Sequence, residues 1–215
     1  GLSFVLALVL APVVPPPGDP PRSLPGVALG IAAEVLMGII AVFGVRILFG
    51  AVQLAGQMMS FQMGFSMARA IDPNTGVQST ALSQFLYLFT VLLFFAMDGH
   101  HLMIRAIAAS FRLAPPNGLS FDPSIAEALM RITAHMFVLG LKVAAPIMIA
   151  LFLSNLCLGI VARTVPQVNI LMIGFPINIG IGLVLFGLLL RNLSPFLTDL
   201  TREAGETMMQ LIRLM

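Results

Sequence analysis

The stretch GQMMSFQMGFSMARAIDPNTGVQS, residues 56–79, is the most informative part of this 215-residue chain. It mixes glutamines, serines and threonines with four methionines, and it ends in the turn-forming run DPNTG at residues 72–76. Each unsatisfied polar group in hydrocarbon costs several kcal/mol of free energy. We therefore expect this segment to face protein, a turn or a water-filled passage instead of lipid.

The composition of the whole chain is that of a membrane protein. Hydrophobic residues make up 59% of the sequence, charged residues 9%, and the mean hydropathy is +1.02. Soluble domains have about a quarter of their residues charged. A chain of this length cannot bury so much apolar surface by itself, so lipid or partner subunits must cover it. The small net charge of +2, with scattered arginines, argues against nucleic-acid binding.

Hydrophobic runs and breakers predict an all-α fold of kinked helices. A proline-rich loop at 15–25 precedes a long helix at 27–71, and Ser79 is expected to cap a helix over 80–97. Asp98-Gly99 ends that helix, and an amphipathic helix continues to Leu113. A loop at 114–118 follows, and Asp122-Pro123 opens a helix that runs to about Gly140. Two uncharged segments come next, at 143–162 with a kink at Pro146 and at 164–190. A final helix begins at Ser194-Pro195.

The chain begins at Gly1 inside an apolar run, GLSFVLALVLAPVV, with no basic n-region before it. It therefore does not resemble a complete signal peptide. We expect a further segment upstream.

Glycines recur every six residues at positions 38, 44, 50 and 56 of the first predicted helix. Six residues turn a helix by about 600°, so these glycines fall on different sides. This spacing indicates close approach of other helices on several sides, or only the general abundance of glycine in membrane helices.

Charged residues within or beside the apolar helices form a second group of interest: Glu34, Arg46, Arg105, Arg131 and Lys142. At such depth an ionisable group should face an opposite charge or water. Glu34 and Arg46 lie about 120° apart around one helix, so they are not expected to pair with each other. They fit either interhelical and intersubunit ion pairs or an ion relay, and packing is the simpler interpretation.

Asp98, His100 and His101 are the residue types of a metal or acid–base site. Adjacent histidines should point to different sides of a helix, and no second carboxylate–histidine cluster is nearby. We therefore predict no metal and no cofactor. The single Cys157 allows no internal disulfide, and no catalytic triad or nucleotide-binding glycine pattern is present. The chain is accordingly not expected to be an enzyme.

Met59, Met63 and Met67 recur at four-residue spacing and so form one stripe of a helix. Flexible, polarizable methionine suits a surface that deforms around varied cargo. Ordinary core filling is the alternative.

Several blocks of sequence, in the same order, resemble the FliR family of flagellar type III export gate subunits. They are GQ (56–57), QMGFSMA (62–68), DP (72–73), DGHH (98–101), AAP (144–146), GIVAR (159–163), PQ (166–167) and NILMIGFP (169–176). The resemblance covers nearly the whole chain, and the DGHH block favours the flagellar branch over the injectisome branch.

The resemblance implies one helical subunit of an export gate that assembles with FliP, FliQ and FlhB in the bacterial inner membrane, within the flagellar basal body. Residues 1–215 would form a single FliR-like domain, with a FliP-like part at 1–124 and a FliQ-like helical hairpin at 125–215. The chain would line and plug the pore through which unfolded flagellar proteins are exported.

Family members have a loop that plugs the closed pore, and by position this plug falls on Ser110, Phe111, Arg112, Leu113, Ala114, Pro115, Pro116, Asn117 and Gly118. Phe111 and Leu113 can fill a narrow opening, while the prolines and Gly118 let the chain leave helical geometry. A plain surface loop is the alternative. Met59, Met63 and Met67 become pore-lining candidates, and Glu34, Arg46, Arg105 and Lys142 become intersubunit candidates. The competing function is a secondary transporter or ion-conducting subunit that uses Glu34, Arg46 and Lys142.

Overall fold

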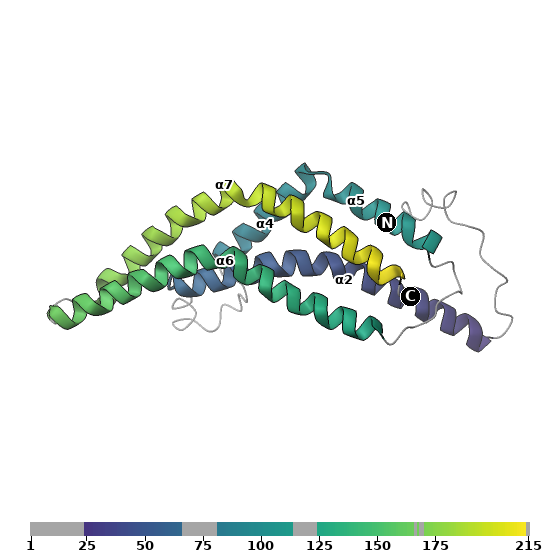
Figure 1. Ribbon diagram of the computed structural model, residues 1–215, viewed down its shortest axis with the longest axis horizontal. Coiled ribbons are helices and arrows are strands. Elements are labelled where there is room, and N and C mark those ends of the chain that lie inside the picture. Colours follow the sequence, from purple (N-terminus) through teal and green to yellow (C-terminus); the bar gives the residue numbers. More distant parts are fainter. Residues whose placement is uncertain (1–23, 66–80, 114–123, 166, 168–169, 214–215) are drawn as a thin grey trace. The chain divides into compact units, whose positions relative to one another are not determined.

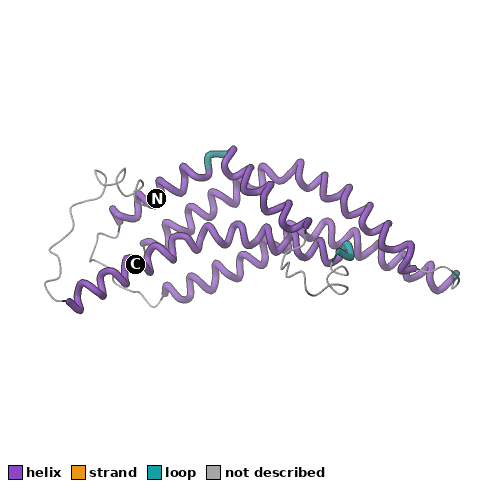
Figure 2. The backbone as a smooth tube through the Cα atoms, turned by 180° about the vertical axis from the view of Figure 1, so that it is seen from behind, coloured by secondary structure: helices purple, strands orange, loops and turns teal. Residues whose placement is uncertain are grey.

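The computed structural model describes residues 24–65, 81–113, 124–165, 167 and 170–213. These residues are almost all helical, with described turns at 63–65 and 97–98, and no strand occurs among them (Figure 2). The all-α prediction is confirmed. The helices, labelled in Figure 1, are α2 (Leu24–Gln62), α4 (Ala81–Ala96), α5 (Gly99–Leu113), α6 (Ser124–Thr164) and α7 (Ile170–Arg213).

The predicted break at Asp98-Gly99 is confirmed, and α4 and α5 begin and end within one residue of their predicted bounds. Several other predictions lie outside the described residues. They are the turn at 72–76, the cap at Ser79, the loop at 114–118 and the pair at 122–123.

Both ends of α2 differ from the prediction. The helix begins at Leu24, so Pro25 belongs to its first turn and not to the preceding loop. Proline fits there because the first N–H groups of a helix have no partner within the helix. The helix ends at Gln62, nine residues before the predicted end at residue 71.

Glycine explains the early end of α2. Gly64 has a φ of 91°, in the left-handed region. The Phe65 N–H donates to the Ser60 carbonyl at 3.0 Å, and the Gly64 N–H donates to the Phe61 carbonyl at 3.1 Å. This pair of bonds is a Schellman motif, the commonest glycine-dependent helix end.

The predicted breaks near Gly140 and at Ser194-Pro195 are wrong. Helix α6 is continuous for 41 residues through Pro146, and α7 is continuous for 44 residues through Pro176 and Pro195 (Figure 1). Proline removes one helical hydrogen bond, but surrounding helices can hold the flanking turns in place. Leu193 and Leu197, on either side of Pro195, are almost completely buried, so packing continues across the proline.

The described helices fall into two compact units, and α2, α4, α6 and α7 each contribute to both. One unit contains residues 49–93 and 135–198. Its core has fully buried side chains from all four helices: Val52, Ala55, Met59, Met63, Leu86, Ala144, Ile147, Leu151, Leu193 and Leu197. The α2 members recur every three or four residues, which places them on one face of that helix.

Glycines let the backbones in this unit approach closely. A Cβ added at Gly56 in α2 would lie 2.7 Å from the Cα of Ser83 in α4. One added at Gly140 in α6 would lie 3.0 Å from the Ala51 carbonyl oxygen in α2. Gly50 lies against the Met136 side chain of α6. Gly50 and Gly56 therefore confirm that neighbouring helices pack on more than one side of α2.

The other unit contains the described parts of residues 1–48, 94–134 and 199–215. Phe94 and Phe95 meet edge to face, with ring centroids 6.0 Å apart. Gly205 in α7 lies against Leu102 in α5, with the Leu102 Cδ2 atom 2.9 Å from the position of an added Cβ. These contacts surround the junction between α4 and α5.

Much of the apolar surface of the chain is uncovered. Two helical stretches, Ile125–Thr164 and Met172–Glu203, are long and apolar enough to cross a membrane, and α4 with the start of α5 adds a third if this bent pair is one span. Within the most apolar windows of the two stretches, only 33% and 22% of the residues are buried by the chain itself. Large exposed side chains on these helices include Phe137, Ile149, Phe152, Ile160, Met172, Val184 and Leu188.

The contact at Gly56 predicts a stability effect. Gly56→Ala should lower the thermal stability of the detergent-solubilised protein, by about 1–3 kcal/mol, because the methyl group meets the Ser83 backbone. The control is Gly187→Ala, since no described atom lies within 4 Å of its added Cβ. That change should be neutral or stabilising, because alanine favours a helix over glycine by about 1 kcal/mol. Equal melting temperatures for the two variants would contradict the close α2–α4 contact.

Candidate functional site

The described part of the methionine stripe lies inside the protein. Met59 and Met63 are both 0% exposed, whereas Met67 lies outside the described residues. A Cβ added at Gly182 in α7 would lie 2.6 Å from the Met63 Cε atom, so glycine there makes room for the Met63 side chain. This burial favours the core-filling alternative for Met59 and Met63, and a pore-lining role for the stripe stays a prediction.

One polar residue beside this stripe, Ser60, also faces protein. Ser60 is 0% exposed, and its hydroxyl donates to the Gly56 carbonyl at 2.7 Å. This bond satisfies a hydroxyl group that hydrocarbon would leave unpaired. The aromatic ring of Phe175 in α7 lies against Gly64 at the end of α2. Met59, Ser60 and Met63 therefore meet the expectation that the segment packs on protein, whereas Gln57 and Phe61 are exposed in this chain.

The charged candidates Glu34, Arg46, Arg105 and Lys142 are all exposed. Within the described residues none of the four forms an ion pair with another part of this chain. They are available to opposite charges outside the chain. Their predicted role between subunits stays a prediction.

The plug candidates fall at the end of α5 and beyond it. The backbone of Ser110, Phe111, Arg112 and Leu113 is helical, and residues 114–118 lie outside the described part of the chain. The plug assignment therefore also stays a prediction.

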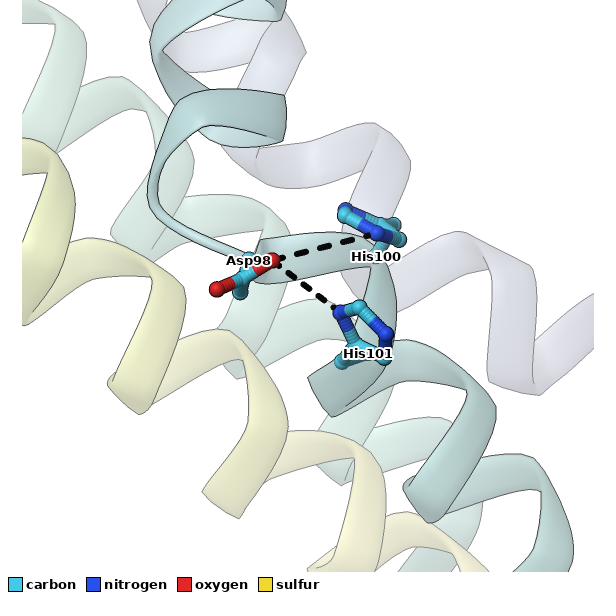
Figure 3. Close-up of side chains that lie close together, drawn as sticks. All are labelled: Asp98, His100 and His101. Atoms are coloured by element: carbon cyan, nitrogen blue, oxygen red, sulfur yellow. Dashed lines mark hydrogen bonds and ion pairs between the residues drawn. The ribbon is translucent and has the colours of Figure 1, made fainter.

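Asp98, His100 and His101 come together at the start of α5 (Figure 3). The Asp98 Oδ1 atom lies 3.1 Å from His101 Nδ1 and 4.0 Å from His100 Nε2. A carboxylate only accepts hydrogen bonds, so His101 Nδ1–H is the donor. One ligand atom from each of the three residues lies within 4.8 Å of the others.

This grouping overturns the expectation that the adjacent histidines diverge too far to share a site. Their ring centroids are 4.2 Å apart. The reason is the turn at Asp98, which has a φ of 57° and precedes the first residue of α5. The turn places the carboxylate alongside both rings, a geometry that helical periodicity alone does not predict.

A second polar cluster joins α6 to α7. The Ser154 hydroxyl donates to Asn178 Oδ1 at 2.9 Å, and Asn178 Nδ2 donates to Asn155 Oδ1 at 2.6 Å. Asn178 is 8% exposed. Sequence reasoning missed this cluster, although asparagine within an uncharged helical stretch was the signal that could have found it. The cluster holds the two longest helices in register.

The sequence model for the family described as bacterial export proteins, family 1, matches residues 1–204. The class of protein that these features define is thus a bacterial export protein. The exposed apolar helices agree with the membrane location that this class implies.

Curated relatives give the more specific comparison. The chain is 38% identical to the flagellar biosynthetic protein FliR of Bacillus subtilis over 71% of this chain and 60% of that protein. Its identity to FliR of Pectobacterium carotovorum is 34%, over 83% of this chain and 69% of that protein. Its identity to FliR of Escherichia coli is 31%, over 79% of this chain and 65% of that protein. The chain therefore belongs to the FliR family of bacterial export proteins and spans between three fifths and seven tenths of these relatives.

The polar cluster predicts a measurable coupling between α6 and α7. Asn178→Leu should lower the stability of the protein in detergent by about 1 kcal/mol, because Ser154 and Asn155 lose their partner. Asn192→Leu is the matched control, since Asn192 is exposed and its amide donates only to Leu188 of its own helix. A double-mutant cycle on Asn155 and Asn178 measures the pair directly. A coupling energy near zero would contradict the role of the cluster.

Proposed function

We propose that the chain is a non-enzymatic subunit of the flagellar type III protein export gate, which lines and plugs the pore for unfolded flagellar proteins. The observation that carries this proposal is membership of the FliR family over residues 1–204. The relatives are flagellar biosynthetic proteins by name. The sequence contains no recognisable catalytic motif, and the chemistry and energy of export are supplied by other components.

The proposed location is the bacterial inner membrane within the flagellar basal body, with FliP, FliQ and FlhB as partners. The exposed apolar surface supports this arrangement. Helices α6 and α7 are 41 and 44 residues long, or about 60 Å at a rise of about 1.5 Å per residue. A hydrocarbon core is about 30 Å thick. Lipid can therefore cover only about half of each helix, and neighbouring subunits are the natural cover for the rest.

We also propose that residues 1–124 form a FliP-like part and residues 125–215 a FliQ-like hairpin. The contacts between α6 and α7 support the hairpin. Asn155 contacts Asn178, and Leu158 contacts Gly174. Later residues of α6 therefore contact earlier residues of α7. This is the contact pattern of two antiparallel helices.

Exposed charges fit the same proposal. The side chains involved are exposed on this chain: Glu34, Arg46, Arg105 and Lys142. We propose that they pair with charges on neighbouring subunits, since an isolated charge among apolar surfaces is unfavourable. The alternative of a secondary transporter built on Glu34, Arg46 and Lys142 is not favoured by the family to which the chain belongs.

If residues 110–118 plug the closed pore, their replacement should let small solutes leak through it. Replacing residues 110–118 by glycine and serine at constant length should make the closed gate permeable to small solutes, because Phe111 and Leu113 no longer fill the opening. A small-solute uptake assay in cells that carry the assembled complex measures this permeability. The matched control is the same replacement over residues 165–169, between α6 and α7.

Unchanged permeability in a plug variant that still assembles would count against the assignment of 110–118. An equal leak in both variants would indicate a general loss of integrity instead of a plug.

A further inference from the structure

We propose that Asp98, His100 and His101 form a binding site for a divalent transition-metal ion, with zinc as the ion that fits best. The ligand atoms are Asp98 Oδ1, His100 Nε2 and His101 Nδ1. The proposal rests on the geometry of these side chains and is independent of the export function.

The distances suit a four-coordinate ion. Zinc binds histidine nitrogen and carboxylate oxygen at about 2.0–2.2 Å in a tetrahedral arrangement, so neighbouring ligand atoms lie about 3.3 Å apart. The distance from Asp98 Oδ1 to His101 Nδ1 is already 3.1 Å. The distance to His100 Nε2 is 4.0 Å, and all three ligand atoms lie within 4.8 Å of one another, so the His100 ring must move closer to the other two ligands when the ion binds.

The backbone at Asp98 holds its carboxylate beside the two rings. A φ of 57° is unusual for a residue other than glycine, although aspartate tolerates it better than most. The Asp98 carbonyl accepts the His101 N–H at 2.9 Å, which fixes the distance between these residues along the first turn of α5. Gly99 must lack a side chain, because a Cβ there would clash with the Phe94 ring.

The His100 ring is positioned by the packing of its other edge. Its Nδ1 atom is buried and has no hydrogen-bond partner among the described residues. The ring lies against Phe95, with centroids 5.4 Å apart. Its Nε2 atom is therefore the nitrogen left for a ligand, and this atom faces Asp98 (Figure 3).

The chemistry of the donor set selects the ion. Imidazole nitrogen favours zinc, copper or nickel over magnesium and calcium. Two neutral histidines and one carboxylate carry a charge of −1, so a divalent ion leaves the site at +1. Coordination through His101 Nδ1 replaces the hydrogen bond that this nitrogen donates to Asp98, and the proton of the ring then lies on Nε2. Three protein ligands leave a fourth position for water or for a group from a partner, and Asp98 and His101 are exposed enough to admit either.

The test measures zinc binding to the full chain, purified in detergent with a histidine-free tag and with any co-purifying subunits. Equilibrium dialysis against zinc chloride should find one zinc ion per chain at this site. Asp98→Gly keeps a backbone that accepts positive φ and removes one ligand, so it should weaken binding at least tenfold. His100→Gln and His101→Gln should do the same, whereas the control His135→Gln, in α6 and not part of the cluster, should leave binding unchanged.

X-ray absorption at the zinc edge provides a second measurement. It should show a shell of nitrogen and oxygen at about 2.0–2.1 Å that includes histidine. The proposal is overturned if wild type retains no more zinc than Asp98→Gly. It is also overturned if His135→Gln weakens binding as much as His101→Gln does.

Discussion

Apolar surface that the chain cannot cover by itself is the constraint on which the rest of the structure depends. Burial of apolar surface is worth about 25 cal/mol per Å², so leaving the exposed faces of α6 and α7 in water would be strongly unfavourable. These faces carry large side chains such as Phe152 and Val184. The fold is therefore stable only in contact with lipid or other subunits. A buried core formed by α2, α4, α6 and α7 within one unit adds internal contacts.

Close contacts between helix backbones add stability that the small number of buried side chains does not provide. In an apolar environment, helices associate through packing and interhelical hydrogen bonds, since lipid is as apolar as leucine. Gly56 and Gly140 bring helix backbones together, and Gly182 makes room for Met63. The bonds from Ser154 and Asn155 to Asn178 then set the register of α6 against α7. Small residues and a few polar side chains thus stabilise the helix packing, which in a soluble protein is stabilised mainly by a large hydrophobic core.

Much of the fold could be predicted from the sequence because breakers and apolar runs mark helices directly. The limits of α4 and the break at Asp98-Gly99 followed from the uncharged run and the DG pair. Proline misled the prediction at Pro195, because a long helix held by its neighbours continues through a single lost hydrogen bond. The end of α2 was missed because Gly64 acts through a Schellman motif and not through hydropathy.

The sites were less predictable, because they depend on local backbone geometry and on contacts between distant residues. Helical periodicity separates His100 from His101, whereas the left-handed backbone of Asp98 places its carboxylate beside both rings. Periodicity also groups Met59 with Met63, but it does not reveal that α7 makes room for Met63 at Gly182.

Native mass spectrometry can show whether other subunits cover this chain. The chain would be co-expressed with FliP and FliQ of the same organism and purified in mild detergent through a tag on this chain alone. If other subunits cover the apolar faces, the chain should be recovered in complexes that contain both proteins. Recovery of a stable, monodisperse single chain while FliP and FliQ are present in the same membranes would contradict it.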